Sequence, residues 1–359
     1  MGSMIHEAQA IVSALRGQTL HVPDLGGIFK NWSVKTNPHY QKVIPVVEDA
    51  FDRMVKNPAL RKKYREANYA RFVSLYFPHP EWNQIKTLAH YIVWLFCWDD
   101  AIDQEGSDLS HNLLRAKTHR SNTIRVLENV LGLTTQPASE IDRDHVNAEL
   151  KNIGDELQKA YTLAQRKAFM SQMRRYIEDC DKEQSLRLRG SLPDLETYGE
   201  IRHGTAGVWT LCALIEFGLG EAVPWRICHM EELHSLWAET SRGIWITNDI
   251  LSLKKEMPKD DRAAESIVNA VPILMAEQGK SPQEAVDALL ADLVVSVAAF
   301  EAAAAALAEA AGEEGRQAVL RYCDACRCMV TGSIQFTFES TRYKLAGCLN
   351  EDGSLDIPL

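Results

Sequence analysis

The sequence predicts an all-α protein, and three observations carry this prediction. Apolar residues recur at helical spacing over long stretches, whereas the alternating runs typical of strands are scarce. No internal repeat and no glycine-rich phosphate loop is present. None of the Gly- and Pro-rich breaks is long enough to be a flexible linker. We therefore expect one domain over residues 4–359, with residues 1–3 set aside as an expression remnant because a second Met follows them.

The helical periodicity and the breaks between helices can be followed along the chain. The Ala-rich segment 295–311 has the strongest intrinsic helix propensity, is ended by Gly312, and is interpreted as a plain structural helix. The clearest helical stretches are 43–54, 124–133, 160–177 and 282–311. Breaks are expected near 23–27, 78–80, 132–137, 190–193, 218–224, 258–261 and 279–282.

Composition and charge exclude some functions. A hydrophobic content of 46% and a charged content of 25% are typical of a soluble globular protein. The net charge of −10 argues against a nucleic-acid partner. It would also repel an anionic substrate unless metal ions bind together with it.

Localisation follows from what the sequence lacks. No segment approaches the run of about 18 apolar residues needed to cross a bilayer, and the N-terminus has no signal-peptide pattern. We expect a cytoplasmic protein without stable membrane association, either monomer or homodimer.

The cysteines are expected to be reduced thiols of the core, because most stand in apolar helical contexts. The close spacing of Cys323, Cys326 and Cys328 raises the alternative of a zinc site, but no second ligand pair with metal spacing accompanies them. The eight cysteines are Cys97, Cys180, Cys212, Cys228, Cys323, Cys326, Cys328 and Cys348.

The first acidic cluster is the DDxxD string of Asp99, Asp100 and Asp103. At about 100° per residue, Asp99 and Asp103 lie about 40° apart on a helix. Such runs are often only a solvated helix end. Here an apolar stretch at 91–98 precedes the cluster, so three carboxylates would end a buried helix, where solvation is a poor explanation.

The second cluster, NDxxSxxKE, has a different pattern. Asn248, Ser252 and Glu256 are spaced i, i+4 and i+8, within about 80° of one helical face. Carboxylate, amide and hydroxyl oxygens without His or Cys suit Mg²⁺, which takes its remaining ligands from water and phosphate. Together the clusters predict a two-walled magnesium site and a phosphorylated substrate.

These motifs resemble those of the class I terpene synthases, particularly the single-domain enzymes of fungi and bacteria. The segment 193–207 looks like the family's diphosphate-sensor segment, with Arg202 standing 46 positions before Asn248 (248 − 202). The pair Arg342 and Tyr343 resembles the family's terminal Arg-Tyr pair. One departure is Phe336, where the family often has Trp. The resemblance implies an antiparallel helical bundle around a deep apolar cavity.

The resemblance also implies roles for the metal-binding residues. Asp99 would be the chief ligand of the first wall, Asp103 the second, and Asp100 an outer partner. Another ion would be chelated on the opposite wall by Asn248, Ser252 and Glu256. Family enzymes use three magnesium ions.

Further roles are implied around the leaving diphosphate. Arg202, Lys255 and Arg342 would bind its oxygens, and Tyr343 would add a hydroxyl donor. Thr205 and Ala206 occupy the positions of a helix break whose carbonyl assists ionisation. For the charged residues the alternative is an ordinary surface ion pair.

The cavity lining is predicted from the positions one helical turn inside the metal ligands. These are Leu95 and Phe96 on the first helix and Ile244 and Trp245 on the second, with Phe336 as a further candidate. Aromatic faces would stabilise a carbocation and exclude water. The alternative is that these side chains are only core.

The expected activity is Mg²⁺-dependent ionisation and cyclisation of a linear prenyl diphosphate, farnesyl diphosphate above all, to a sesquiterpene hydrocarbon or alcohol with release of diphosphate. Geranylgeranyl diphosphate, giving a diterpene, is the main alternative substrate. A chain-elongating prenyltransferase would normally carry a second DDxxD.

A non-catalytic helical protein or a di-iron bundle stays open as an alternative of another class. The pairs Glu200/His203 and Glu231/His234 both have the ExxH spacing of di-iron bundles.

Overall fold

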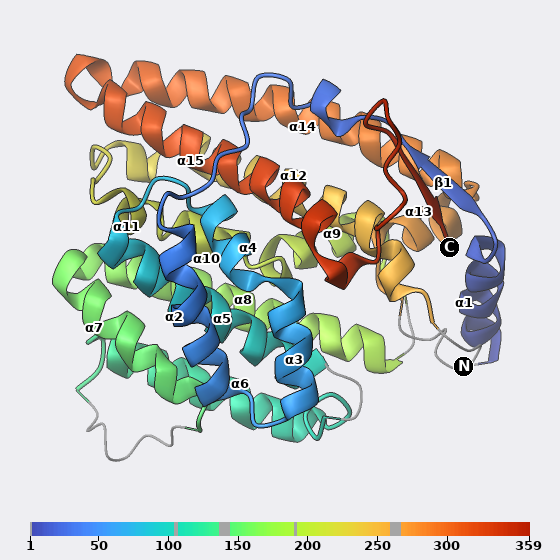
Figure 1. The fold of residues 1–359 in the computed structure, drawn as a ribbon, viewed down its shortest axis with the longest axis horizontal. Coiled ribbons are helices and arrows are strands. Elements are labelled where there is room, and N and C mark those ends of the chain that lie inside the picture. The colour runs from blue at the N-terminus through green and yellow to red at the C-terminus, as the bar shows by residue number, and fades with distance from the viewer. Residues whose placement is uncertain (1, 104–106, 136–143, 190–191, 259–266) are drawn as a thin grey trace.

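The described residues of the computed structural model are 2–103, 107–135, 144–189, 192–258 and 267–359, and they fold mostly into helices (Figure 1). This confirms the all-α prediction. The helices are α1 Gly2–Leu15, α2 Tyr40–Met54, α3 Pro58–Ala67, α4 Tyr69–Tyr76, α5 Trp82–Asp103, α6 Leu113–Val130, α7 Leu150–Ala160, α8 Leu163–Arg189, α9 Leu195–Thr205, α10 Val208–Cys212, α11 Ile215–Leu219, α12 Glu231–Glu256, α13 Ala270–Gln278, α14 Pro282–Ala310 and α15 Gly312–Glu339. Short 3₁₀ turns are η1 Leu25–Gly27, η3 Asn147–Glu149, η4 Ile227–His229 and η6 Thr341–Tyr343.

Helix α14 could be predicted well because the sequence marks both of its ends. Ser281 caps its first turn, and the Glu284 side chain accepts a hydrogen bond from the Ser281 backbone N–H, a complete capping box with Pro282 at the first helical position. At the other end Gly312 takes φ +66°, where a left-handed conformation lets α15 start at once. The helix predicted over 282–311 is confirmed to within one residue.

The helix predicted over 160–177 is wrong at its start. Helix α7 ends at Ala160, and α8 begins only at Leu163. Between them Tyr161 is extended (φ −102°, ψ 138°), and its hydroxyl donates to the Ala213 carbonyl at 2.9 Å. A tertiary contact of a buried tyrosine, which periodicity does not report, thus separates two helices.

Helix α12 is the central element of the bundle. It packs against α14, α15, α10, α13 and α9, and lies behind α15 in Figure 1. Most of its length is buried, including Leu236, Ile246, Ile250 and Leu253. A helix buried all round can carry polar residues only where they are satisfied, so the polar residues near its C-terminal end mark a site.

A two-stranded antiparallel ribbon packs against α14 and was not predicted. Strand β1 (Thr19–Val22) pairs with β2 (Leu355–Pro358), with Thr19 opposite Pro358 and Val22 opposite Leu355. Leu20 and Ile357 face the core from this ribbon. It brings the two ends of the chain to the same side of the molecule (Figure 1).

By length and mean hydropathy α14 is a helix that could cross a membrane, so the expectation that no segment approaches this limit was wrong. Alanine and valine raise its hydropathy although Asp and Glu interrupt the run. Its buried side, with Leu289, Leu293 and Phe300, packs against α12 and α15 as a helix of the bundle.

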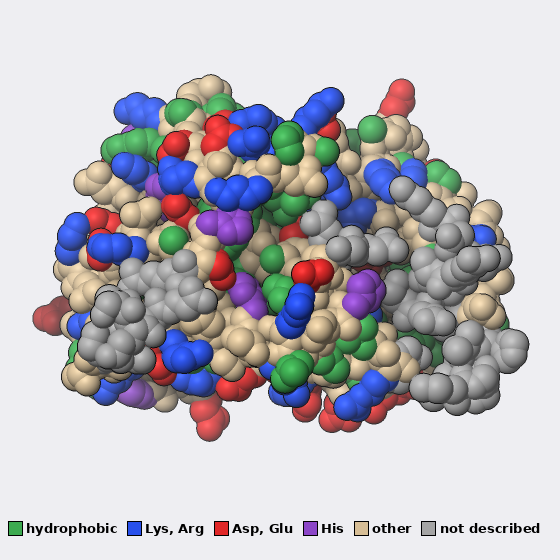
Figure 2. Space-filling model, turned by 90° about the horizontal axis from the view of Figure 1, so that it is seen from below, with side chains coloured by type: hydrophobic (Ala, Val, Ile, Leu, Met, Phe, Trp, Pro, Cys, Tyr) green, Lys and Arg blue, Asp and Glu red, His purple; other side chains and the backbone are tan. Residues whose placement is uncertain are grey.

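On the face of the molecule that Figure 2 shows, basic and acidic side chains are interspersed.

Two glycines of α9 give a matched test of how closely this helix approaches α8. A Cβ at Gly204 would lie 1.9 Å from Asp179 Oδ2, whereas a Cβ at Gly199 would meet nothing within 4 Å. We expect Gly204→Ala to lower the free energy of unfolding by about 2 kcal/mol or more, because Asp179 is buried and must shift. Gly199→Ala should raise it by about 0.5 kcal/mol. Urea unfolding followed by circular dichroism measures both; equal effects would contradict the close contact.

Candidate active site

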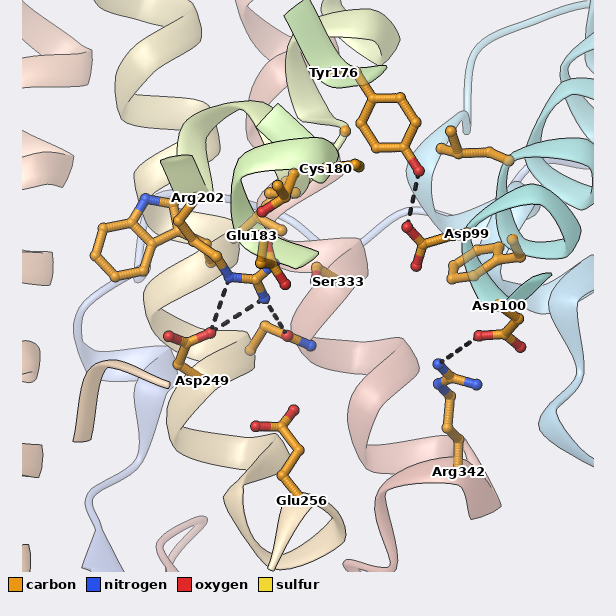
Figure 3. Close-up of a pocket in the computed structure, with 18 of the residues that line it drawn as sticks. Asp99, Asp100, Tyr176, Cys180, Glu183, Arg202, Asp249, Glu256, Ser333 and Arg342 are labelled. Carbon is orange, nitrogen blue, oxygen red and sulfur yellow. Dashed lines mark hydrogen bonds and ion pairs between the residues drawn. The ribbon is translucent and has the colours of Figure 1, made fainter. Parts of the chain in front are cut away.

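A cavity of about 450 Å³ opens between α5, α8, α9, α12 and α15, and Figure 3 shows part of its lining. Asp99 and Asp100 lie on one side of it, and Asp249 and Glu256 lie on the other. The two clusters, far apart in sequence, therefore share one cavity. Its interior is lined by apolar and aromatic side chains, including Phe72, Leu95, Phe96, Leu211, Ile244 and Trp245.

The first wall is the C-terminal end of α5. Asp99 accepts a hydrogen bond from the Tyr176 hydroxyl at 3.0 Å. Asp100 accepts one from the Tyr64 hydroxyl and lies 3.8 Å from Arg342 Nη2. Both carboxylates line the cavity, and Asp100 pairs with the Arg342 guanidinium. Asp103 ends the helix, and its side chain lies outside the described part of the chain.

The second wall is one face of α12. Asn248 Oδ1 accepts from Arg202 Nη2 at 3.0 Å, and Asn248 Nδ2 donates to the Tyr343 hydroxyl at 3.4 Å. Ser252 Oγ donates to Glu256 Oε1 at 2.6 Å. Asn248 and Glu256 line the cavity, whereas Ser252 is fully buried beneath Glu256. Two of the three residues of the expected i, i+4, i+8 stripe therefore reach the cavity, and Ser252 is bonded to Glu256 behind its surface.

Cationic side chains surround the space between the walls. Lys255 Nζ lies 3.6 Å from Glu256 Oε1 and 5.4 Å from the centre of the Tyr343 ring, and burial lowers the pKa of Lys255. Arg342 Nη1 donates to the Tyr69 hydroxyl at 3.2 Å. With Arg202, all of the residues expected to bind diphosphate line the same cavity. A low-dielectric cavity with several fixed cations suits a multiply charged anion.

Asp249 organises the second wall, a role that the sequence analysis did not assign. Its carboxylate accepts hydrogen bonds from the Tyr198 hydroxyl at 2.5 Å, from Arg202 at 3.2 Å and from the Ala270 backbone N–H at 3.0 Å. Burial raises the pKa of Asp249, while Arg202 opposes that shift. Burial disfavours the charge of Arg202, but Asp249, Tyr198, Glu183 and Glu256 together favour it more strongly, so the pKa of Arg202 is raised. In the sequence, the position of Asp249 next to Asn248 in the motif was the only indication that Asp249 belongs to the site.

Four of the five predicted cavity residues reach the cavity: Leu95, Phe96, Ile244 and Trp245. Phe336 does not line it, which corrects the expectation for that position. Its ring packs edge-on against Phe72 at 5.1 Å and Tyr343 at 6.3 Å, so it supports the wall from behind. Phe72 and Tyr76 on α4 were missed because nothing in their spacing ties α4 to the metal motifs.

The segment after Arg202 is a true helix break. Helix α9 ends at Thr205, Gly207 takes φ +69°, and α10 begins at Val208. Thr205 and Ala206 line the cavity at this break. The expected irregularity is therefore present at the expected positions.

Comparison with known proteins decides the family. The model of the family described as terpene synthase family 2, C-terminal metal binding, matches residues 90–296, more than half of the chain. The chain belongs to the terpene synthases. This synthase is 28% identical to the sesquiterpene cyclase hepA of Aspergillus oryzae, over 99% of this chain and 97% of the relative. It is 23% identical to a germacrene A synthase of Nostoc punctiforme, covering 81% and 85% of the two chains.

Solved terpene synthases share the fold of this synthase. The linalool/nerolidol synthase of Streptomyces clavuligerus superposes with a TM-score of 0.71 at 20% identity, covering 85% of this chain and 98% of that one. The germacradien-4-ol synthase of Streptomyces citricolor also gives a TM-score of 0.71, at 17% identity over 85% and 96% of the chains. The class I terpenoid synthase fold predicted from the motifs is confirmed.

The donors of this synthase fit a hard divalent metal. Asp99, Asn248, Ser252 and Glu256 offer only oxygen atoms. Two further polar atoms of the cavity, Glu183 Oε2 and Thr205 Oγ1, are buried and have no hydrogen-bond partner within the described residues. Glu183 lies on α8 and was not predicted. Buried polar atoms without partners are costly unless a ligand or water satisfies them.

The di-iron alternative fails for this synthase. His203 packs edge-on against Trp245, and His234 lies among Trp209 and Trp237. Among the described residues, the His, Cys, Asp and Glu side chains converge as a possible metal site only at His79, Asp324 and Cys328, which include neither ExxH pair.

Proposed function

We propose that this terpene synthase ionises and cyclises a linear prenyl diphosphate with the help of Mg²⁺. The observation that carries the proposal is the meeting of two unlike oxygen-donor walls across one cavity, with cationic side chains at the walls and an apolar interior. We propose farnesyl diphosphate as the substrate and a sesquiterpene hydrocarbon or alcohol as the product, with geranylgeranyl diphosphate as the alternative substrate.

The chain's own residues would hold the diphosphate group. Arg202, Lys255 and Arg342 carry cationic donors toward the cavity, and Tyr343 adds a hydroxyl. Asp99, Asn248, Ser252 and Glu256 would hold magnesium, three ions in all by family resemblance. Bound magnesium neutralises the charge that develops on the departing diphosphate. Asp249 keeps Arg202 oriented, because a single carboxylate binds it from a fixed position on α12.

The interior would protect the carbocation after ionisation. Phe72, Phe96 and Trp245 present ring surfaces at the cavity, where a ring face stabilises positive charge. The helix break at Thr205 and Ala206, where a backbone carbonyl would assist ionisation, lies at the same cavity. Apolar walls exclude water that would end the reaction early.

The preference for fifteen carbons is supported by likeness to a sesquiterpene cyclase along nearly the whole chain. We further propose a single domain over residues 4–359, a cytoplasmic location, and a monomer or homodimer. One connected core, from Ile11 to Ile357 in the described residues, supports the single domain.

Incubation with ten-, fifteen- and twenty-carbon diphosphates tests the function. With Mg²⁺, the fifteen-carbon substrate should give cyclic hydrocarbon or alcohol products by gas chromatography with mass spectrometry, together with released diphosphate. Chelation by EDTA should abolish both. Linear condensation products, or unreacted substrate in all three reactions, would contradict the proposal, and cyclic products from only the twenty-carbon substrate would support the alternative.

A further inference from the structure

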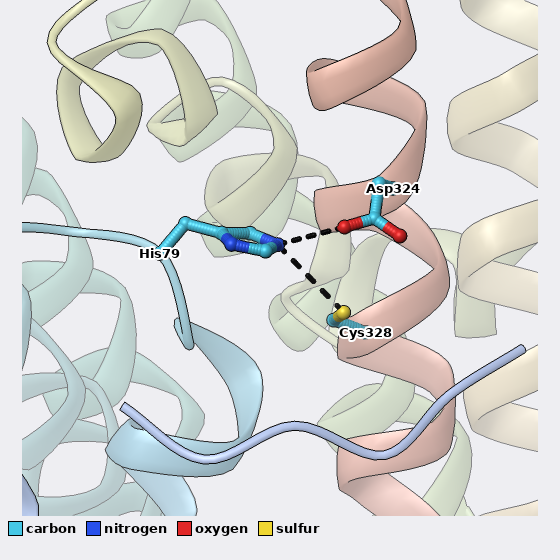
Figure 4. Close-up of side chains that lie close together, drawn as sticks. All are labelled: His79, Asp324 and Cys328. Atoms are coloured by element: carbon cyan, nitrogen blue, oxygen red, sulfur yellow. Dashed lines mark hydrogen bonds and ion pairs between the residues drawn. The ribbon is translucent and has the colours of Figure 1, made fainter. Parts of the chain in front are cut away.

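Three side chains with metal-ligating atoms meet between α15 and the segment that precedes α5, and none of them lines the reaction cavity (Figure 4). Asp324 and Cys328 are one turn apart on α15, and His79 comes from the segment between α4 and α5. Their ligand atoms all lie within 4.8 Å of one another. The synthase chemistry uses none of the three.

The geometry distinguishes a metal site from a catalytic relay. His79 Nε2 lies 2.9 Å from Asp324 Oδ2 and 3.9 Å from Cys328 Sγ. A thiol–imidazole–carboxylate relay needs the acid and the thiol on opposite ring nitrogens. Here both face the same nitrogen, so thiol, carboxylate and imidazole converge on one point.

We propose that His79, Asp324 and Cys328 form a zinc site, separate from the oxygen-donor site of the cavity. One sulfur, one nitrogen and one oxygen are a donor set that suits Zn²⁺ and not Mg²⁺. With zinc bonds of about 2.0 Å to nitrogen and oxygen and about 2.3 Å to sulfur, a tetrahedral ion needs ligand atoms roughly 3.3–3.5 Å apart. The observed 2.9 and 3.9 Å lie on either side of that spacing. His79 and Asp324 side chains are 29% and 34% exposed, so water can take the fourth position.

The protonation states of Asp324 and Cys328 determine which proton must leave when a metal ion binds. Hydrogen bonding from His79, with Lys35 also contributing, lowers the pKa of Asp324 to about 2, so this ligand is already charged. Burial raises the pKa of Cys328 to about 12, so the thiol must release one proton to solvent when the metal binds. Lys35 is the competitor, because its Nζ lies 2.6 Å from Asp324 Oδ2. Its side chain is 39% exposed and can turn into solvent.

The position of the cluster indicates a structural role. It would link the segment before α5 to the middle of α15. From Trp82, where α5 starts, to Asp99 is 17 residues (99 − 82), about 26 Å of helix, so the ion would not touch the diphosphate. Zinc there would fix the two helices that lead to the first wall and to Arg342.

Cobalt(II) titration of the full chain, in buffer with excess Mg²⁺ to occupy the oxygen-donor walls, tests the proposal. The wild type should develop the near-ultraviolet charge-transfer band of a cobalt–thiolate bond and the visible bands of tetrahedral cobalt. Cys328→Ser should abolish the thiolate band, and His79→Ala should weaken binding at least about tenfold. Lys35→Ala should tighten it, because Asp324 is then released. Cys228→Ser, at a more accessible thiol, is the matched control and should keep the full signal.

Zinc should displace cobalt and raise the melting temperature of the wild type but not of Cys328→Ser. Circular dichroism checks that each variant is folded; if Cys328→Ser is not, Lys35→Ala and His79→Ala still decide the matter. A missing thiolate band in the wild type, a band that survives Cys328→Ser, or binding unchanged by His79→Ala would each overturn the site.

Discussion

Asp99→Ala is expected to lower kcat/KM for the prenyl diphosphate by at least about a thousandfold, equivalent to about 4 kcal/mol of transition-state stabilisation. Asp99 lines the cavity at the end of α5, and as the chief metal ligand of the first wall it would fix the ion that meets the leaving group. Its loss should not unfold the protein, because the Tyr176 hydroxyl can turn to water in the opened cavity. Diphosphate release at saturating Mg²⁺ measures the effect.

A suitable control is Asp108→Ala, which removes a carboxylate that is 85% exposed and pairs with Arg115. It should retain full activity. Asn248→Ala, on the opposite wall, should be as damaging as Asp99→Ala, since both walls are needed to hold the metal-bound diphosphate. If either wall variant kept wild-type turnover while circular dichroism showed a native helix content, that wall would have no part in ionisation.

Asp249→Ala is expected to destabilise the fold by about 3–5 kcal/mol. The substitution leaves the Arg202 guanidinium, whose side chain is only 18% exposed, without its carboxylate, and it removes the acceptor of the Tyr198 hydroxyl and the Ala270 N–H. Removing one member of a buried charged pair destabilises the fold by more than the intact pair stabilises it, because the remaining charge is left without a partner in a buried position. Urea unfolding followed by circular dichroism measures the loss.

Asp249→Asn separates the charge from the hydrogen bonds. It keeps an acceptor oxygen of nearly the same shape, so it should lose clearly less stability than the alanine variant while still releasing Arg202 from its ion pair. Equal losses for the two variants would mean that packing, and not satisfaction of Arg202 and Tyr198, accounts for the effect.

The two metal-binding walls could be predicted from the sequence because the spacing of residues along a helix is a local property. Once α5 and α12 are helices, Asp99 and the stripe of Asn248, Ser252 and Glu256 must each lie on one face. That the two helix faces lie opposite each other could be predicted only from the resemblance of the motifs to a known family, because spacing within one helix says nothing about the position of another.

What remained hidden depends on contacts between distant elements. The role of Asp249 is set by partners from α9 and α13, and Glu183 reaches the cavity only through the packing of α8. The break at Tyr161 likewise follows from a hydrogen bond to the far Ala213 carbonyl. In the sequence, Cys328 was considered as a zinc ligand together with Cys323 and Cys326. In the structure its partner is His79, which lies 249 residues away in sequence.

The ribbon of β1 and β2 has a consequence for Arg342 and Tyr343. These residues lie in η6, between the end of α15 and the paired strand β2, so the segment that carries them is anchored on both sides. Ser340 Oγ and Thr341 Oγ1 add hydrogen bonds to the carbonyls of Ala67 and Glu66 at the end of α3. The conformational entropy of this pair is therefore lost during folding and not at substrate capture, which makes a terminal segment as preorganised as the helices it faces.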